Sequence, residues 1–414
     1  MIKTANPVNN DVPPPGLKRS ISLTFLTFYG LGTIIGAGIY VLIGEVVGRA
    51  AYLAPLSFLL AAVIAGFTAF TYAELSSRYP RSAGESWYLS RAFSMRWPSL
   101  LAGWGVVGIG VISSATIVNG FAGYLHEFVA IDTGFAITLL VVLLGLVAAW
   151  GIRESVWLAS IITLLEIGGL VFVSVIAIDG IQASGIPTIN FDVSISTNTL
   201  GPILSGAFLA FYAFIGFEDM VNIAEEVKDP RRNMPRAIML ALTVSTLLYI
   251  GIAIIAVLAI DPRQLSQSSA PLAELVRGHS ANAVIIISLI GMVAVVNGAL
   301  IQIIMASRVL YGMAQQGNAP KQLGQVNRTT RTPLHATVLV VILLLVFALW
   351  LPLLTLATIT SFITLAIFSA MHLTLWRLKV LDVKSDATVN YPLWVPVTGF
   401  IISLGFMLTE LLIN

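Results

Sequence analysis

The sequence predicts an all-α polytopic membrane protein of about eleven transmembrane helices, the first ten of which form two inverted repeats of five. Three observations predict this class: an extreme apolar composition, a series of apolar runs long enough to span a bilayer, and matched interruptions in two of those runs. Of the 414 residues, 57% are hydrophobic and only 10% are charged. The mean hydropathy of +0.92 lies far outside the range of soluble proteins.

The apolar runs define the helices in chain order, because about 20 apolar residues cross the hydrocarbon core of a bilayer. They lie at 21–47, 51–75, 97–127, 135–152, 154–178, 200–224, 235–260, 281–314, 334–350, 353–377 and 391–412. We interpret the polar residues 1–19 as a cytoplasmic tail without a cleavable signal peptide. The transporter core is predicted at 20–380, with repeats at 20–178 and 200–380, and 391–414 adds a further C-terminal helix.

The basic residues predict the orientation. With the N-terminus in the cytoplasm, 19 of the 22 Lys and Arg residues lie in segments on the cytoplasmic side, and only Arg49, Arg263 and Arg277 lie on the other. Cytoplasmic loops of membrane proteins carry such an excess of positive charge. If one helix had been missed, the basic residues would be divided between the two sides of the membrane. The one-sided distribution of positive charge therefore also supports the helix count. We expect an integral protein of a plasma (inner) membrane.

Two of the runs are interrupted at matching positions. The first contains Gly36-Ala37-Gly38, and the sixth is interrupted around 212–216, five helices later. Glycine weakens a helix interior and tolerates unusual dihedral angles, so we expect both segments to unwind near the bilayer midplane. Paired interruptions in halves of opposite topology are typical of inverted-repeat transporters. The alternative is that the glycines only let helices pack closely.

The unwound segments predict a binding site, because lipid cannot satisfy unpaired backbone groups. The N–H groups after Gly38 begin a half-helix whose positive dipole end suits a carboxylate. The carbonyls of Ile34, Tyr212 and Ile215 are expected to accept hydrogen bonds from an ammonium group. An aromatic residue beside the second break is expected to close over the substrate, with ordinary packing as the alternative. The predicted substrate-binding residues are Ile34, Gly36, Ala37, Gly38, Tyr212, Phe214 and Ile215.

Five separated motifs follow one another along the chain. They are GTIIGAGIYVLIG at 32–44, YAEL with YPRSAG within 72–84, GIRES at 151–155, FIGFE with AEEVKDPRRNMPR within 214–236, and SRVLYGMA at 307–314. In this order they resemble the amino acid–polyamine–organocation transporters, particularly the cationic amino acid transporter branch and its bacterial relatives. The resemblance implies the leucine-transporter fold, alternating access and an amino-acid substrate. The family usually has twelve helices, so its dimer interface is not carried over and the oligomeric state stays open.

Glu166 lies near the middle of the predicted fifth helix. A carboxylate in the membrane interior is costly, so such groups usually face the bundle interior or a water path. In some proton-coupled members of the family that this chain resembles, this position carries a lysine, which occupies the place of a sodium ion. Glu166 would put an acid where those members have a base. We expect Glu166 to carry a coupling proton, or to ligate a cation with Asn297 and Gly298, sodium being less favoured. The alternative is a protonated acid that only packs between helices.

Glu218 follows the second break and matches a family position associated with proton sensing and gating. Asp219 is its neighbour in the chain. Adjacent side chains point about 100° apart on a helix, so only one of the two carboxyls is expected to face the pathway. A structural hydrogen bond is the alternative role for Glu218.

The predicted function is a secondary active amino-acid permease with proton symport. Neutral amino acids are slightly favoured, because the predicted third helix has no acid between Gly103 and Leu125. The alternatives are a proton-independent exchanger and a polyamine or cationic amino acid transporter. The chain has no cysteine and no metal motif, so we expect no enzyme activity, no cofactor and no metal. A net charge of only +2 argues against nucleic acid, which leaves the substrate and the lipid bilayer as partners.

Overall fold

The computed structural model describes residues 19–36, 38–81, 84–93, 95–150, 156–184, 197–315, 317–327, 330, 332–381 and 386–413. Within these residues, helices are joined by short connections, and the extended pairing consists of one isolated bridge between Ile21 and Val227. The all-α polytopic class is therefore confirmed. The predicted tail lies almost wholly outside the described residues, as does the motif at 151–155.

Both predicted interruptions are present. Helix α1 (Leu23–Ile35) is separated from α2 (Gly38–Ala50) at Gly36 and Ala37, of which Ala37 lies outside the described residues. Helix α8 (Thr197–Phe214) is separated from the 3-10 helix η2 (Glu218–Glu226) by three residues, slightly later than predicted. The φ angle of Gly216 is +131°, which L side chains rarely adopt, and a Cβ there would lie 2.4 Å from the Thr33 carbonyl oxygen. Glycine at 216 therefore lets the two breaks meet.

The remaining long helices match the other predicted runs. They are α3 (Ala54–Arg78), α5 (Trp97–Leu125), α6 (Thr133–Trp150), α7 (Val156–Ser184), α9 (Pro230–Ala259), α12 (Ala281–Gln315), α13 (Leu334–Trp350), α14 (Leu353–Val380) and α15 (Trp394–Ile413). Within the described residues, nine helical stretches are long and apolar enough to cross a membrane. One of them, Leu23–Arg78, contains two predicted runs, and α13 is a shorter apolar helix. Within the part of the chain that the structure describes, nine predicted runs thus correspond to single helices, and the first and sixth to broken ones.

Helix α9 begins at Pro230, five residues before the predicted apolar run at 235–260, because its first turn is polar and an apolar run marks only the part of a helix that can lie in lipid. Pro230 occupies the first turn, where a missing N–H breaks no helical hydrogen bond. Pro235 lies inside the helix and cannot bond the Arg231 carbonyl four residues earlier. That carbonyl instead accepts hydrogen bonds from the hydroxyls of Ser77 (2.8 Å) and Thr388 (2.6 Å). Side chains from elsewhere therefore allow the helix to continue through Pro235.

Short helices occupy connections between the predicted runs. They are η1 (Ala51–Leu53), α4 (Gly84–Ala92), α10 (Pro262–Ser266), α11 (Pro271–Glu274) and η3 (Lys321–Gly324). Helix α10 starts with a proline after Asp261, whose carboxylate accepts the backbone N–H of Arg263 at 2.8 Å. Helices α10 and α11 pack against α2 at one end of the bundle.

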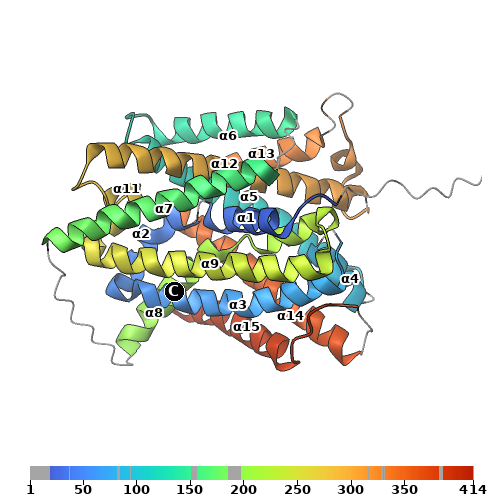
Figure 1. The fold of residues 1–414 in the computed structure, drawn as a ribbon. Coiled ribbons are helices and arrows are strands. Elements are labelled where there is room, and N and C mark those ends of the chain that lie inside the picture. Colours follow the sequence, from blue (N-terminus) through green and yellow to red (C-terminus); the bar gives the residue numbers. More distant parts are fainter. Residues whose placement is uncertain are drawn as a thin grey trace, which may run out of the picture.

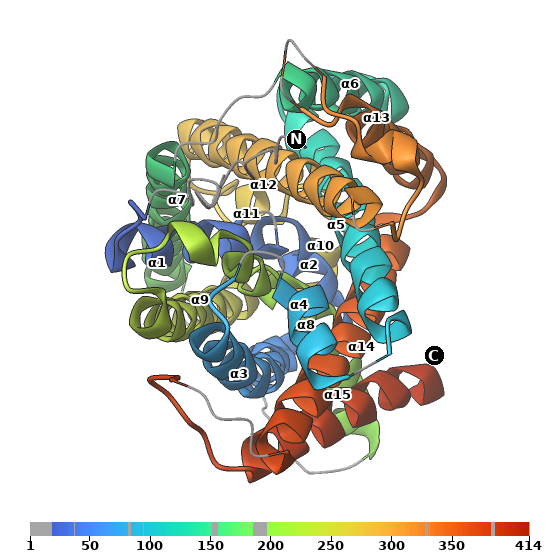
Figure 2. The same cartoon turned by 90° about the vertical axis from the view of Figure 1, so that its right-hand side faces the viewer.

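The long helices run side by side, and the broken helices lie inside the bundle (Figure 1). Viewed along the bundle, α2 is central, α6 and α13 lie together at one edge, and α15 lies at the opposite edge (Figure 2). Ten of the 13 residues of α2 are buried. Helices α1 and α2 pack against α7, α8 and α9, so both breaks are enclosed by protein rather than exposed to lipid.

Candidate functional site

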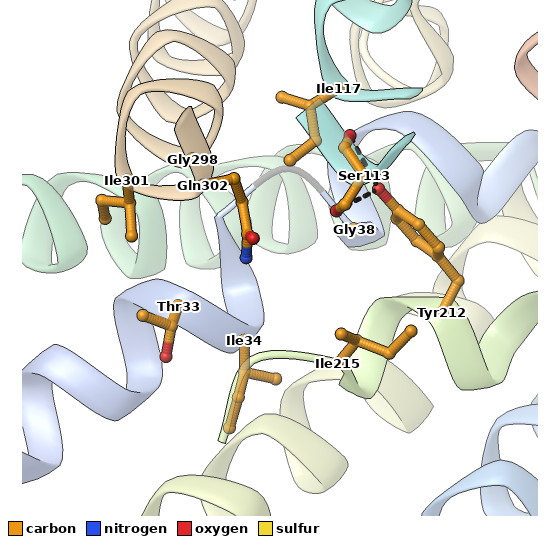
Figure 3. Close-up of a pocket in the computed structure, with 10 residues that line it drawn as sticks. All are labelled: Thr33, Ile34, Gly38, Ser113, Ile117, Tyr212, Ile215, Gly298, Ile301 and Gln302. Atoms are coloured by element: carbon orange, nitrogen blue, oxygen red, sulfur yellow. Dashed lines mark hydrogen bonds between the residues drawn. The ribbon is translucent and has the colours of Figure 1, made fainter. Parts of the chain in front are cut away.

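A cavity of about 30 Å³ lies where the two broken helices meet α5 and α12 (Figure 3). Its lining residues are Thr33, Ile34, Gly38, Ser113, Ile117, Tyr212, Ile215, Gly298, Ile301 and Gln302. This volume holds about one or two water molecules. The walls therefore have to move apart before an amino acid can enter.

The first break contributes Gly38 to the cavity. Gly38 begins α2, so the first N–H groups of that helix have no partner within it. A Cβ at Gly38 would lie 2.6 Å from the Cα of Ala213, so α2 approaches α8 more closely than any side chain allows. Gly36 does not line the cavity, and its N–H donates to the Gly32 carbonyl at 3.1 Å. The donors available for a carboxylate thus begin at Gly38 among the described residues.

Two of the three predicted carbonyls, those of Ile34 and Tyr212, are hydrogen-bonded in this conformation, contrary to the expectation that they are unpaired. The Tyr249 hydroxyl of α9 lies 2.8 Å from the Ile34 carbonyl oxygen and 3.0 Å from that of Ala213. Tyr249 is fully buried and connects the two breaks through one side chain. The Tyr212 carbonyl accepts the N–H of Ile215 at 3.1 Å, as in a tight final turn. A substrate ammonium group would have to compete with these donors or use the second lone pair of each oxygen.

Polar side chains lie on two walls of the cavity. The hydroxyls of Ser113 and Tyr212 are 2.9 Å apart, and Tyr212 also donates to the Ser113 carbonyl at 3.2 Å. On α12, Nε2 of Gln302 donates to Oδ2 of Asp219 at 3.1 Å. The Gln302 carbonyl oxygen is buried without a hydrogen-bond partner among the described residues. Figure 3 shows Gln302 and the Ser113–Tyr212 pair reaching the cavity from different helices.

Glu218 and Asp219 are both buried, and they serve different partners. Oε2 of Glu218 accepts the N–H of Gly216 at 2.8 Å and so binds a backbone donor freed by the second break. Asp219 binds Gln302, as described above. Neither carboxyl lines the cavity directly.

A third carboxyl, Glu85 of α4, interacts electrostatically with Glu218 and Asp219. Oε1 of Glu85 accepts a hydrogen bond from the Tyr72 hydroxyl at 2.9 Å. Burial raises the pKa of Glu85 above its usual value, and the hydrogen bond from Tyr72 offsets this only in part. Three buried carboxyls of α4 and η2 therefore influence one another electrostatically.

Glu166 of α7 is completely buried and lies outside the cavity lining. Its carbonyl accepts a hydrogen bond from the Tyr40 hydroxyl at 2.6 Å, whereas neither carboxyl oxygen has a hydrogen-bond partner among the described residues. Asn297 of α12 lies beside the carboxyl, although its amide nitrogen does not meet the carboxyl oxygens in hydrogen-bond geometry. Gly298 follows Asn297 and lines the cavity. Of the three predicted coupling residues of α7 and α12, Gly298 therefore lies at the cavity, whereas Asn297 and Glu166 lie outside its lining.

The aromatic residues beside the second break are divided between cavity and core. Tyr212 lines the cavity, whereas Phe214 is fully buried and its ring centroid lies 5.0 Å from that of Tyr249. Phe214 therefore supports the bridge between the breaks in this conformation rather than covering the cavity. Among the described residues, no group of three or more His, Cys, Asp and Glu side chains could hold a metal ion.

The predicted site lacks six residues that the structure places in or beside the cavity, namely Thr33, Ser113, Ile117, Tyr249, Ile301 and Gln302. Gln302 carried a usable signal, because it is a polar residue in an apolar run and lies four residues after Gly298, on the same helix face. Tyr249 carried none, since an aromatic residue in an apolar run is ordinarily a packing residue. The aliphatic lining residues Ile117 and Ile301 are likewise indistinguishable from core positions in the sequence.

Known proteins resemble this chain over most of its length. A family model described as amino acid permease matches residues 20–413. The mitochondrial cationic amino acid transporter 3 of Arabidopsis thaliana is 28% identical over 385 residues, covering 87% of this chain and 62% of the relative. The methylthioribose transporter of Bacillus subtilis (strain 168) is 27% identical over 414 residues, covering 94% and 88%. The branched-chain amino acid permease BcaP of the same strain is 27% identical over 343 residues, covering 78% and 72%.

The chain thus spans less than two thirds of the plant transporter and most of each bacterial one. The match of the family model extends across both broken helices, the cavity and the last helix. Together with the membrane-spanning helices, it identifies an integral membrane protein. The chain belongs to the amino acid permease family.

Proposed function

We propose that the protein is a secondary active amino-acid permease that works by alternating access, with its N-terminus in the cytoplasm of a cell bounded by a plasma membrane. The observation that carries the proposal is the cavity between two broken helices, lined by Gly38 on one side and by Tyr212 and Ile215 on the other. The half-helix beginning at Gly38 supplies N–H donors for a carboxylate. Backbone carbonyls at the breaks supply acceptors for an ammonium group.

Neutral amino acids fit the cavity better than cationic ones. Its ten lining residues include no acidic side chain. The nearest described carboxyl in hydrogen-bond contact with the lining is Asp219, which is engaged by Gln302. Three of the relatives are named for cationic amino acids, for branched-chain amino acids and for methylthioribose, so family membership leaves the substrate open. A polyamine or cationic amino acid is the alternative cargo, and proton-independent exchange is the alternative mode.

Proton coupling through Glu166 completes the proposal. A carboxyl group without solvent or hydrogen-bond partners is accommodated far better as a neutral acid than as an anion. Glu166 also interacts electrostatically with the hydroxyls of Tyr40 and Tyr249. Tyr249 contacts both breaks, so a change in the protonation of Glu166 can reach the cavity walls through one side chain. Opening towards water would let the acid ionise and release its proton, which ties proton movement to the transport cycle.

The test is uptake of labelled neutral amino acids into proteoliposomes that contain the purified full chain. An imposed inward proton gradient should drive accumulation by the wild type. Glu166→Gln mimics a permanently protonated acid, so it should lose gradient-driven accumulation while exchange of internal for external substrate persists. Asp179→Asn is a matched control, because Asp179 is an exposed acid on the same helix. Accumulation by Glu166→Gln equal to that of the wild type would contradict coupling through this residue.

Recognition of the amino-acid backbone is tested in the same vesicles. Analogues that lack the carboxylate, or whose amine is acylated, should compete at least about tenfold more weakly than the parent amino acid, equivalent to about 1.4 kcal/mol. Equal competition by an amine without a carboxylate would favour a polyamine as substrate.

A further inference from the structure

Gln302 is the polar residue of the cavity whose hydrogen-bonding capacity is only half used. Its side chain lines the cavity, and the residue is only 7% exposed. Nε2 is bound by Asp219, whereas the carbonyl oxygen Oε1 has no partner among the described residues. An acceptor buried without a partner is costly, and a donor brought by the substrate would remove that cost.

Asp219 determines which end of the amide is free. The NH₂ group of Gln302 can only donate, and it is directed at Oδ2 of Asp219, which accepts its hydrogen bond. Two other carboxyls influence Asp219, those of Glu85 and of its chain neighbour Glu218. Both accept hydrogen bonds from other groups, Glu85 from Tyr72 and Glu218 from the Gly216 N–H. The amide oxygen is therefore the end of Gln302 left for a ligand in the cavity.

The hydroxyls of the opposite polar wall are already hydrogen-bonded to each other and to the backbone. The Tyr212 hydroxyl donates to the Ser113 carbonyl, and the hydroxyls of Tyr212 and Ser113 bond to each other, so both protons are used while the oxygens keep acceptor lone pairs. The other lining side chains are those of the aliphatic residues Ile34, Ile117, Ile215 and Ile301 and of Thr33, whose hydroxyl donates to the Gly30 carbonyl at 2.9 Å. Gly298, one helical turn before Gln302, has no side chain to cover it. Among the lining side chains, Gln302 Oε1 is the acceptor that is buried without any partner within the described residues, so it gains most from a donor on the substrate.

We propose that Gln302 is a specificity-determining residue that accepts a hydrogen bond from the side chain of the substrate, and that Asp219 is its positioning residue. The inference rests on the proposed function and narrows it. The preferred substrates are small neutral amino acids whose side chain carries a hydroxyl or amide donor. Aliphatic amino acids of the same shape leave the acceptor unpaired and are disfavoured. A site built to bond a substrate hydroxyl discriminates strongly against the analogue that lacks it.

Threonine and valine test the proposal directly, because they have nearly the same shape and differ by one hydroxyl. The measurement is kcat/KM for uptake of each labelled amino acid into proteoliposomes containing the full chain. In the wild type, threonine should be favoured by at least about tenfold. In Gln302→Leu the ratio should fall to about one or below, because the acceptor is replaced by a methyl-bearing side chain of similar size.

Asp219→Asn tests the positioning role. An asparagine can donate as well as accept, so the Gln302 amide is no longer held in one orientation and the threonine-to-valine ratio should fall several-fold. A merely structural role would lower uptake of both amino acids equally and leave the ratio unchanged. Gln315→Leu is the matched control, since Gln315 is an exposed glutamine on the same helix, and its ratio should equal that of the wild type.

The outcomes separate this inference from the proposed function. Uptake of other neutral amino acids with no preference for threonine over valine in the wild type overturns the role of Gln302, and this comparison needs no variant. A threonine preference that survives in Gln302→Leu overturns it as well. Absence of uptake of every amino acid in the labelled mixture contradicts the permease function itself.

Discussion

Single residues hold the two broken helices together. The Tyr249 hydroxyl contacts a carbonyl on either side, and its ring packs against Phe58 and Phe214 at centroid distances of 6.0 and 5.0 Å. Gly216 allows the second break to lie against Thr33 of the first. These contacts join the walls of the cavity in the closed conformation, so they have to change when the cavity opens.

Tyr249→Phe should destabilise this closed conformation while keeping the ring packing. The two buried carbonyls of Ile34 and Ala213 lose their shared donor, which costs about 1–3 kcal/mol. Thermal unfolding of the detergent-solubilised protein measures the loss. Tyr88→Phe is the matched control, because the Tyr88 hydroxyl is buried without a hydrogen-bond partner among the described residues and its removal should be neutral or stabilising. Equal effects of the two substitutions would contradict the bridging role.

At the scale of elements, an ion-pair network joins α5 to the connection between α9 and α12. Arg277 lies 2.6 Å from Oε1 of Glu127, just after α5, and 2.6 Å from Oε2 of Glu274 in α11. Gln264 of α10 donates to the same Glu274 at 2.9 Å. Helices α10 and α11 pack on α2, the second half of the first broken helix. The network therefore connects α2 to the end of α5.

The network should make stability depend on pH. Burial raises the pKa of Glu274, but the hydrogen bonds from Arg277 and Gln264 and the charge of Arg277 outweigh burial and hold this pKa below its usual value. A lowered pKa in the folded state means that the ionised carboxylate stabilises the fold at pH values above 4.5, the usual value for glutamate. This contribution is lost as the pH falls through the lower folded-state pKa.

Arg277→Gln should therefore lower the thermal unfolding midpoint at pH 7, by a small amount because Arg277 is 46% exposed. The difference from the wild type should shrink as the pH is lowered below 4.5. Arg263→Gln, in α10 of the same connection, is the control and should show less change at either pH. A difference that is constant with pH would contradict the role of the Glu274 carboxylate.

At the scale of the whole molecule, every predicted apolar run is helical, and the first and sixth runs are broken. The ends of the bundle differ in charge, because the basic residues lie mostly in segments on the predicted cytoplasmic side. The orientation in the membrane is therefore a testable consequence of the charge distribution.

Cysteine labelling tests the orientation, because the natural chain contains no cysteine and gives no background. Gln267 and Gln322 are matched exposed glutamines in connections predicted to lie outside and inside, respectively. In intact cells a membrane-impermeant maleimide should label Gln267→Cys and leave Gln322→Cys unlabelled until the membrane is permeabilised. The reverse pattern would contradict the predicted orientation.

The fold class, the helices and the approximate positions of both breaks can be predicted from the sequence. Apolar length decides what can span a bilayer, and glycine decides where a helix is weak, and both properties are local. For this reason α12 at Ala281–Gln315 agrees with the predicted run at 281–314. Motif order also predicted the family correctly, as the family model confirms.

The contacts between side chains depend on how the helices pack and cannot be predicted from the sequence. The Arg231 carbonyl freed by Pro235 is satisfied by Ser77 and Thr388, which are distant in the chain. In the same way, the Ile34 carbonyl is paired by Tyr249, and Gln302 is oriented by Asp219 across two helices. A hydrogen bond requires two atoms to lie about 3 Å apart. The apolar pattern of a sequence shows only which face of a helix is buried, not which atoms that face meets. Packing of the whole bundle is needed to bring these atoms together.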